Sequence, residues 1–73
     1  MVELTLATLL NTIATDFCEL RRNDTSLLTS VLISYSNAND KYGGENVRRV
    51  INESIGIEPL AVAAVVSQCP DQL

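Results

Sequence analysis

The chain has 73 residues, and a chain this short forms a single domain with a small hydrophobic core, because short chains bury a smaller fraction of their surface on folding. Its net charge of −4, from 9 acidic and 5 basic residues, repels nucleic acid and anionic lipid, which argues against a general binder of either. The sequence contains no histidine, the usual general base near neutral pH and a common metal ligand, so we expect no enzymatic activity, no metal and no cofactor.

Residues 3–22 have the pattern of an amphipathic helix. Apolar side chains recur at steps of three and four, while threonines and acidic residues fall on the opposite side. The apolar positions are Leu6, Leu10, Ile13, Phe17 and Leu20. Arg21 and Arg22 lie in the predicted last turn, where positive charge interacts favourably with the exposed carbonyl groups.

A second helix is predicted at residues 25–40, after a polar corner at residues 23–26 that favours helix capping. Its apolar residues keep helical spacing, and we expect them to face the core. They are Leu27, Val31, Tyr35, Ala38 and Tyr42. Part of the segment 27–36 also alternates as a strand does, and we favour a helix because a lone strand would have no partner. The Asn and Asp residues within 37–40, followed by two glycines, predict the main loop of the chain.

Two further helices are predicted, at residues 45–55 and 58–69. Gly56 suits the end of the first, and Pro59 suits the first turn of the second. The last helix carries no charge from Leu60 to Cys69, and its apolar residues surround the helix axis, so most of its surface must be covered. The sequence therefore predicts an all-α protein: a compact four-helix bundle with short connections, in which the first two helices form an antiparallel hairpin.

The two cysteines, Cys18 and Cys69, lie far apart in the sequence. A disulfide between them would close a long loop and stabilise the fold. However, the Met-Val-Glu start has neither the basic residues nor the apolar run of a signal peptide. We therefore expect a cytoplasmic protein with reduced, buried thiols. The uncharged stretches are too short or too polar to span a bilayer, so we expect no association with a membrane.

The uncharged last helix is the most informative feature for function. Three short helices cannot easily cover a fourth on all sides, so we expect this helix to contact another protein, with a homodimer as the favoured oligomer. The predicted interface residues are Leu60, Ala61, Ala64, Val65 and Gln68. The leading hypothesis is a non-enzymatic interaction protein that acts as an inhibitor, adaptor or regulator by binding a protein partner.

Two alternatives remain open. Residues 47–66 have the outline of a helix-turn-helix and would suit a small DNA-associated regulator, although the would-be recognition helix has no basic residue. Residues 43–49 would suit a binding module for a small anionic ligand, because a glycine turn leads into a helix that carries two arginines. The candidate residues are Gly43, Gly44, Arg48 and Arg49, although Glu45 places a carboxylate beside them.

Overall fold

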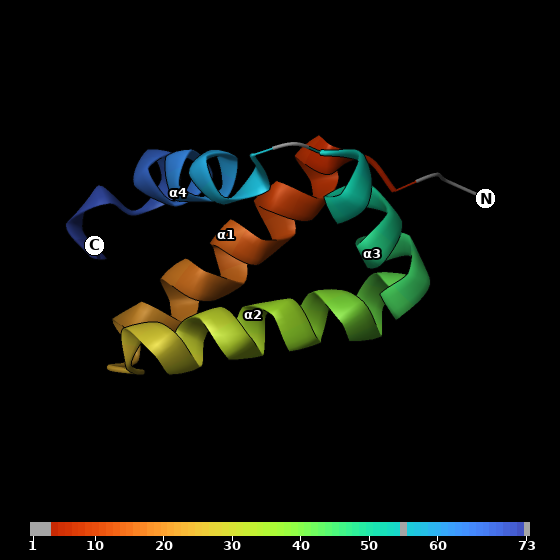
Figure 1. The fold of residues 1–73 in the computed structure, drawn as a ribbon. Coiled ribbons are helices and arrows are strands. Elements are labelled where there is room, and N and C mark those ends of the chain that lie inside the picture. The colour runs from red at the N-terminus through yellow and green to blue at the C-terminus, as the bar shows by residue number, and fades with distance from the viewer. Residues whose placement is uncertain (1–3, 55, 73) are drawn as a thin grey trace.

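The computed structural model describes residues 4–54 and 56–72, which form four α-helices and one short 3₁₀ helix (Figure 1). The elements are α1 (Leu6–Arg22), α2 (Leu27–Tyr42), α3 (Gly44–Glu53), α4 (Ile57–Gln68) and η1 (Pro70–Gln72). The predicted all-α class and four-helix arrangement are confirmed, and the segment 27–36 is helical. Glu3 and Ile55, which the sequence places in helices, lie outside the described residues, as does Leu73.

Helix α1 occupies the centre of the fold. Helices α2 and α4 each pack against it, whereas they have little contact with each other (Figure 1). Helix α3 follows α2 around a tight corner and packs against α2 and α1. Side-chain caps define where the long helices begin: the Thr5 hydroxyl accepts a hydrogen bond from the Thr8 amide, and the Ser26 hydroxyl accepts one from the Thr29 amide.

The break predicted between Asn37 and Gly44 is wrong over most of its length, because α2 continues past the predicted end at residue 40 to Tyr42. Ala38 is fully buried, and the Tyr42 hydroxyl lies 2.6 Å from the Thr12 hydroxyl of α1. These contacts outweigh the weak helix propensity of Asn and Asp, which costs at most about 0.7 kcal/mol per residue. The connection to α3 is reduced to Gly43, whose φ of +88° is readily adopted by glycine.

The predicted core face of α2 is confirmed at Ala38, and at Tyr35 and Tyr42, which pack against the core, but it is wrong at Leu27 and Val31. The helix packs against α1 through a row of small residues, Ser30, Ser34 and Ala38, each with no exposed surface. Leu27 and Val31, which we expected in the core, are 53% and 36% exposed. Small side chains spaced four residues apart allow the two helix backbones to approach closely, and the larger apolar row is thereby turned away from α1.

The buried serines of α2 are satisfied within their own part of the chain. The Ser34 hydroxyl donates to the carbonyl oxygen of Ser30 at 2.6 Å, and the Ser30 hydroxyl donates to that of Thr25 at 3.4 Å. No buried side-chain nitrogen or oxygen in residues 4–54 and 56–72 lacks a hydrogen-bond partner. The serine row therefore does not carry the cost of unpaired polar groups that would otherwise disfavour its burial.

The core is divided between the two ends of α1. One cluster lies around Leu9, which is fully buried, and includes residues from α1, α2, α3 and the start of α4. Its members are Leu4, Leu9, Ile13, Ala38, Val47, Val50 and Ile57. The other cluster joins the second half of α1 to the end of α4. Its members are Ala14, Phe17, Cys18, Val65 and Cys69.

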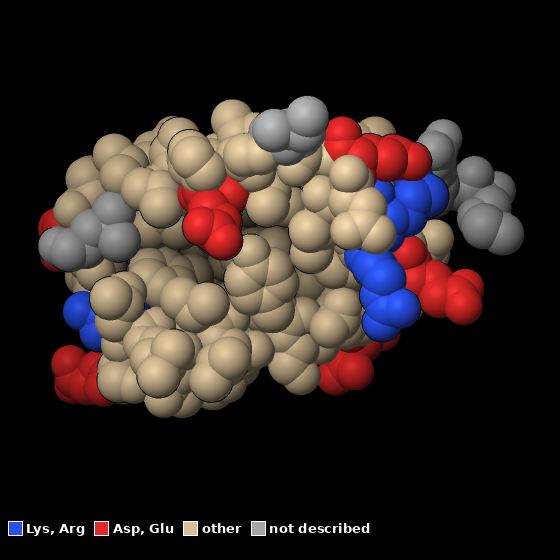
Figure 2. Space-filling view, viewed as in Figure 1, with Lys and Arg blue, Asp and Glu red and all other residues tan. Residues whose placement is uncertain are grey.

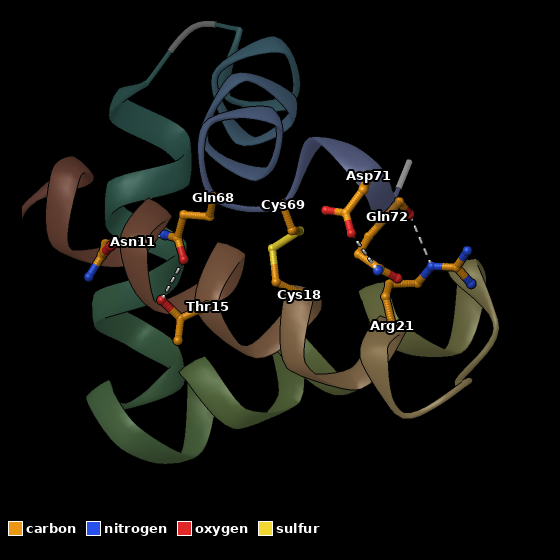
Figure 3. The surroundings of a disulfide bond; sticks show 8 residues. All are labelled: Asn11, Thr15, Cys18, Arg21, Gln68, Cys69, Asp71 and Gln72. Carbon is orange, nitrogen blue, oxygen red and sulfur yellow. Dashed lines mark hydrogen bonds between the residues drawn. A yellow bond between two sulfur atoms is a disulfide. The ribbon is translucent and has the colours of Figure 1, made fainter.

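Cys18 and Cys69 form a disulfide, so the prediction of reduced thiols is wrong (Figure 3). Their Cα atoms are 5.9 Å apart, within the range that a disulfide bridges, and both residues are buried. On one side of the disulfide, Gln68 accepts a hydrogen bond from the Thr15 hydroxyl and donates one to the Asn11 side chain. These contacts join the end of α4 to α1.

Candidate functional site

An open apolar groove of about 340 Å³ lies between α2 and α4. The buried side chains of Ile13 and Phe17 on α1 form its floor, and residues of α2 and α4 form its two walls. The wall residues are Leu27, Val31 and Tyr35 on α2, and Glu58, Ala61, Val62 and Val65 on α4. We call this surface the α2–α4 groove.

The groove follows from how its two walls are attached to α1. The serine row holds α2 against one flank of α1 and leaves Leu27 and Val31 on the rim. The disulfide and the buried Val65 hold α4 against the other flank, which leaves Val62 56% exposed. Because α2 and α4 make little contact with each other, the space between them stays open.

The apolar surface extends beyond the groove. Large apolar residues on the outer sides of α2 and α4 are also exposed, namely Leu28, Leu32, Leu60 and Val66. Figure 2 shows the face between the two helices as almost free of charge. The exception is an acidic group over α4, where Glu58 is the one charged residue of the helix. At the end of this face over α3, basic side chains lie among acidic ones.

A second hollow, of about 230 Å³, adjoins the α2–α4 groove. Its lining residues are Tyr35, Asn39, Gly44, Val47, Arg48 and Ile51, and we call it the α3 hollow. Tyr35 lines both depressions, so the hollow and the groove lie on either side of this residue. Arg48 is exposed, and its guanidinium has no hydrogen-bond or ion-pair partner in the described part of the chain.

The residues of the predicted anion site are only partly brought together. Gly44 and Arg48 meet at the α3 hollow, while Gly43 forms the corner before it. Arg49 is engaged elsewhere: it donates to the Glu53 carboxylate at 3.4 Å and to the carbonyl oxygen of Leu4 at 3.4 Å. One arginine, not two, is therefore available to a ligand in the α3 hollow.

The predicted interface residues of the last helix lie in different environments. Ala61 and Val65 line the α2–α4 groove, and Leu60 is 42% exposed outside it. Ala64 packs against the disulfide cluster, and Gln68 is hydrogen-bonded to α1. Sequence reasoning missed every groove residue on α1 and α2, together with Glu58 and Val62 on α4. The small residues at 30, 34 and 38 were the signal that could have revealed the outward face of α2.

Helices α3 and α4 cover the predicted helix-turn-helix at residues 47–66, and the angle between the two helices is 104°. That angle lies in the range of helix-turn-helix units. However, α3 packs against α2 and α4 against α1. The exposed side of α4 presents Leu60, Val62 and Val66, with no basic group to contact a DNA backbone.

No three His, Cys, Asp or Glu side chains in residues 4–54 and 56–72 are grouped so as to hold a metal ion. Within the same residues, no single helix is long and apolar enough to cross a membrane. Helices α3 and α4 reach the required length and hydropathy only as a pair, across their sharp bend.

The chain matches no protein-family model, and no curated protein or solved structure is significantly similar to it.

Proposed function

We propose that the chain is a small non-enzymatic protein that binds a protein partner through the α2–α4 groove. It acts as an inhibitor, adaptor or regulator by occupying the partner's surface. One observation supports this proposal above the others: α2 buries serines against its own chain and turns Leu27, Val31 and their apolar neighbours outward. A helix with that orientation has its best hydrophobic face available to another molecule.

The extent of the apolar surface also supports a partner. Single exposed apolar residues are normal on a monomer, whereas contiguous apolar patches mark interaction sites. Here the exposed residues of α2 and α4 lie on both sides of one groove whose floor is also apolar. Fully burying one Leu or Val side chain contributes about 1.5–3 kcal/mol, so a partner that covered several of them would gain enough for specific binding.

The proposal is tested with peptides selected from a random display library on the immobilised, oxidised protein. Val62→Asp and Val66→Asp form a matched pair, because both valines lie on α4 and are 56% and 45% exposed, but only Val62 lines the groove. We expect Val62→Asp to weaken the selected peptides at least about tenfold, since a carboxylate would be buried against apolar side chains. Val66→Asp should change the affinity by no more than about twofold.

Three results would argue against the proposal: no selected binders, equal loss in both variants, or no loss in either. The mass of the protein in solution is measured alongside. The proposal includes the homodimer that the sequence favours. If Val62→Asp converts a dimer to a monomer and Val66→Asp does not, the two copies contact each other through the α2–α4 groove.

A further inference from the structure

The shape of the α2–α4 groove selects among the ways in which a protein segment can bind. Leu27, Val31 and Tyr35 are spaced four residues apart along α2, and the apolar wall of α4 faces them. Parallel ridges of this kind receive the side chains of another helix. Strand addition, one way of binding an extended peptide, needs a sheet edge, and the described residues form no strand. The groove therefore fits an amphipathic helix.

The charges around the groove are placed unevenly. Glu58 stands on the α4 wall, so an acidic side chain lying beside α4 would be repelled. Beyond Tyr35, the charged residue of the α3 hollow is Arg48, which has no ion-pair partner among the described residues. Asn39 adds a polar side chain to the same hollow. A negative group on a bound helix is therefore favoured beside Arg48, in the α3 hollow.

The following inference rests on the proposed function and specifies the partner. We infer that the occupant of the α2–α4 groove is an amphipathic helix of a partner protein, with an acidic side chain near one end. Its apolar stripe lies between Leu27 and Val62, and its carboxylate pairs with the guanidinium of Arg48. The ion pair orients the helix and favours partners that carry the acidic residue, while the apolar stripe supplies most of the affinity.

The test uses three acetylated and amidated peptides of about four helical turns, each with leucines on one face at helical spacing. They differ at one position in the last turn, which is Glu, Gln or Lys. Fluorescence anisotropy measures their binding to the wild-type protein and to Arg48→Glu, Arg22→Glu and Val62→Asp. Arg22→Glu is the control for net charge, because Arg22 is an exposed arginine that lines neither depression.

We expect the Glu peptide to bind the wild-type protein about two- to fivefold more tightly than the Gln peptide, and the Lys peptide to bind most weakly. Arg48→Glu should reverse this order, and Arg22→Glu should preserve it. The differences should shrink at roughly 0.5 M salt, where exposed charges are screened. Val62→Asp should weaken all three peptides.

If the three peptides bind the wild-type protein equally and Val62→Asp weakens them all, the role of Arg48 is refuted while the proposed function stands. If no peptide binds and the protein is a dimer that Val62→Asp dissociates, the occupant is a second copy of the chain and the inference is overturned. If sodium decanoate binds the groove more tightly than any peptide, the occupant is an acyl chain and the inference is likewise overturned. If nothing binds and the protein is monomeric, both proposals fail.

Discussion

The Cys18–Cys69 disulfide should supply a large share of the stability of this fold. The two cysteines are separated by 51 residues, and in the chain-entropy model a loop of that length is worth about 4 kcal/mol. At roughly 0.05–0.15 kcal/mol per residue, the whole chain is expected to unfold with a free energy of only about 4–11 kcal/mol. Breaking the disulfide should therefore leave the protein close to its folding threshold.

The measurement is urea denaturation followed by far-ultraviolet circular dichroism, on the oxidised protein, on the same protein reduced with a phosphine, and on the Cys18→Ala/Cys69→Ala variant. Reduction isolates the loss of the cross-link, while the variant also removes the packing of the two sulfur atoms. We expect the free energy of unfolding to fall by about 4 kcal/mol and the melting temperature by roughly 15–30 °C. A fall of less than about 1 kcal/mol in both samples would show that the chain-entropy reasoning does not apply here.

Four further predictions concern stability and redox state. Leu9→Ala should lower the free energy of unfolding by about 2–5 kcal/mol, because Leu9 is fully buried. Ser34→Leu should cost about 1–3 kcal/mol by forcing α2 away from α1, whereas Ser34→Ala should cost no more than about 1 kcal/mol, since the Ser34 hydroxyl bonds only to its own helix. Val62→Asp should change the free energy of unfolding by no more than about 0.5 kcal/mol, because Val62 is mostly exposed. Urea denaturation measures the free energy of unfolding of all these variants. Thiol alkylation in the native cells tests the disulfide and the location together: we expect both cysteines to resist alkylation until they are reduced, which would place the chain in an oxidising compartment and not in the cytoplasm.

Helix α1 was the most predictable part of the fold, because its local signals agree. The apolar residues at steps of three and four and the basic last turn indicate one helix that ends at Arg22, as observed. Its start was predicted too early, because Leu4 and the capping residue Thr5 precede the first helical residue, Leu6. Such signals depend on neighbours in the sequence, so sequence reasoning can find them. Gly56 was predicted to end the third helix, but α3 already ends at Glu53 with Ser54 as its C-cap, and Gly56, with a φ of +78°, is the N-cap of α4.

The disulfide could not be predicted in the same way. Its formation depends on Cys69 lying over Cys18 once α4 has packed along α1, and spacing in the sequence does not report that distance. We expected reduced thiols because the sequence suggested a cytoplasmic protein, and the cytoplasm is reducing. The structure shows that the distance requirement is met, with both sulfur-bearing residues inside one core cluster.

The reason why Leu27 and Val31 of α2 were wrongly predicted to be buried bears on function. The helix has two rows with the same spacing, a small one through Ser34 and a large apolar one through Val31, and periodicity alone favours the larger as the core. In the folded chain the small row is buried, because it lets α2 lie close to α1 and its two hydroxyls bond to the nearby carbonyl groups of Ser30 and Thr25. If the groove binds a partner helix, the large row is buried as well, but only in the complex. The large apolar row of α2 then indicates which residues are buried in the complex, not which are buried in the single chain.

Ser34→Leu and Val62→Asp separate the two surfaces of α2 and the groove. Ser34→Leu should impair folding with little direct effect on the groove, and Val62→Asp should impair binding in a protein that is still folded.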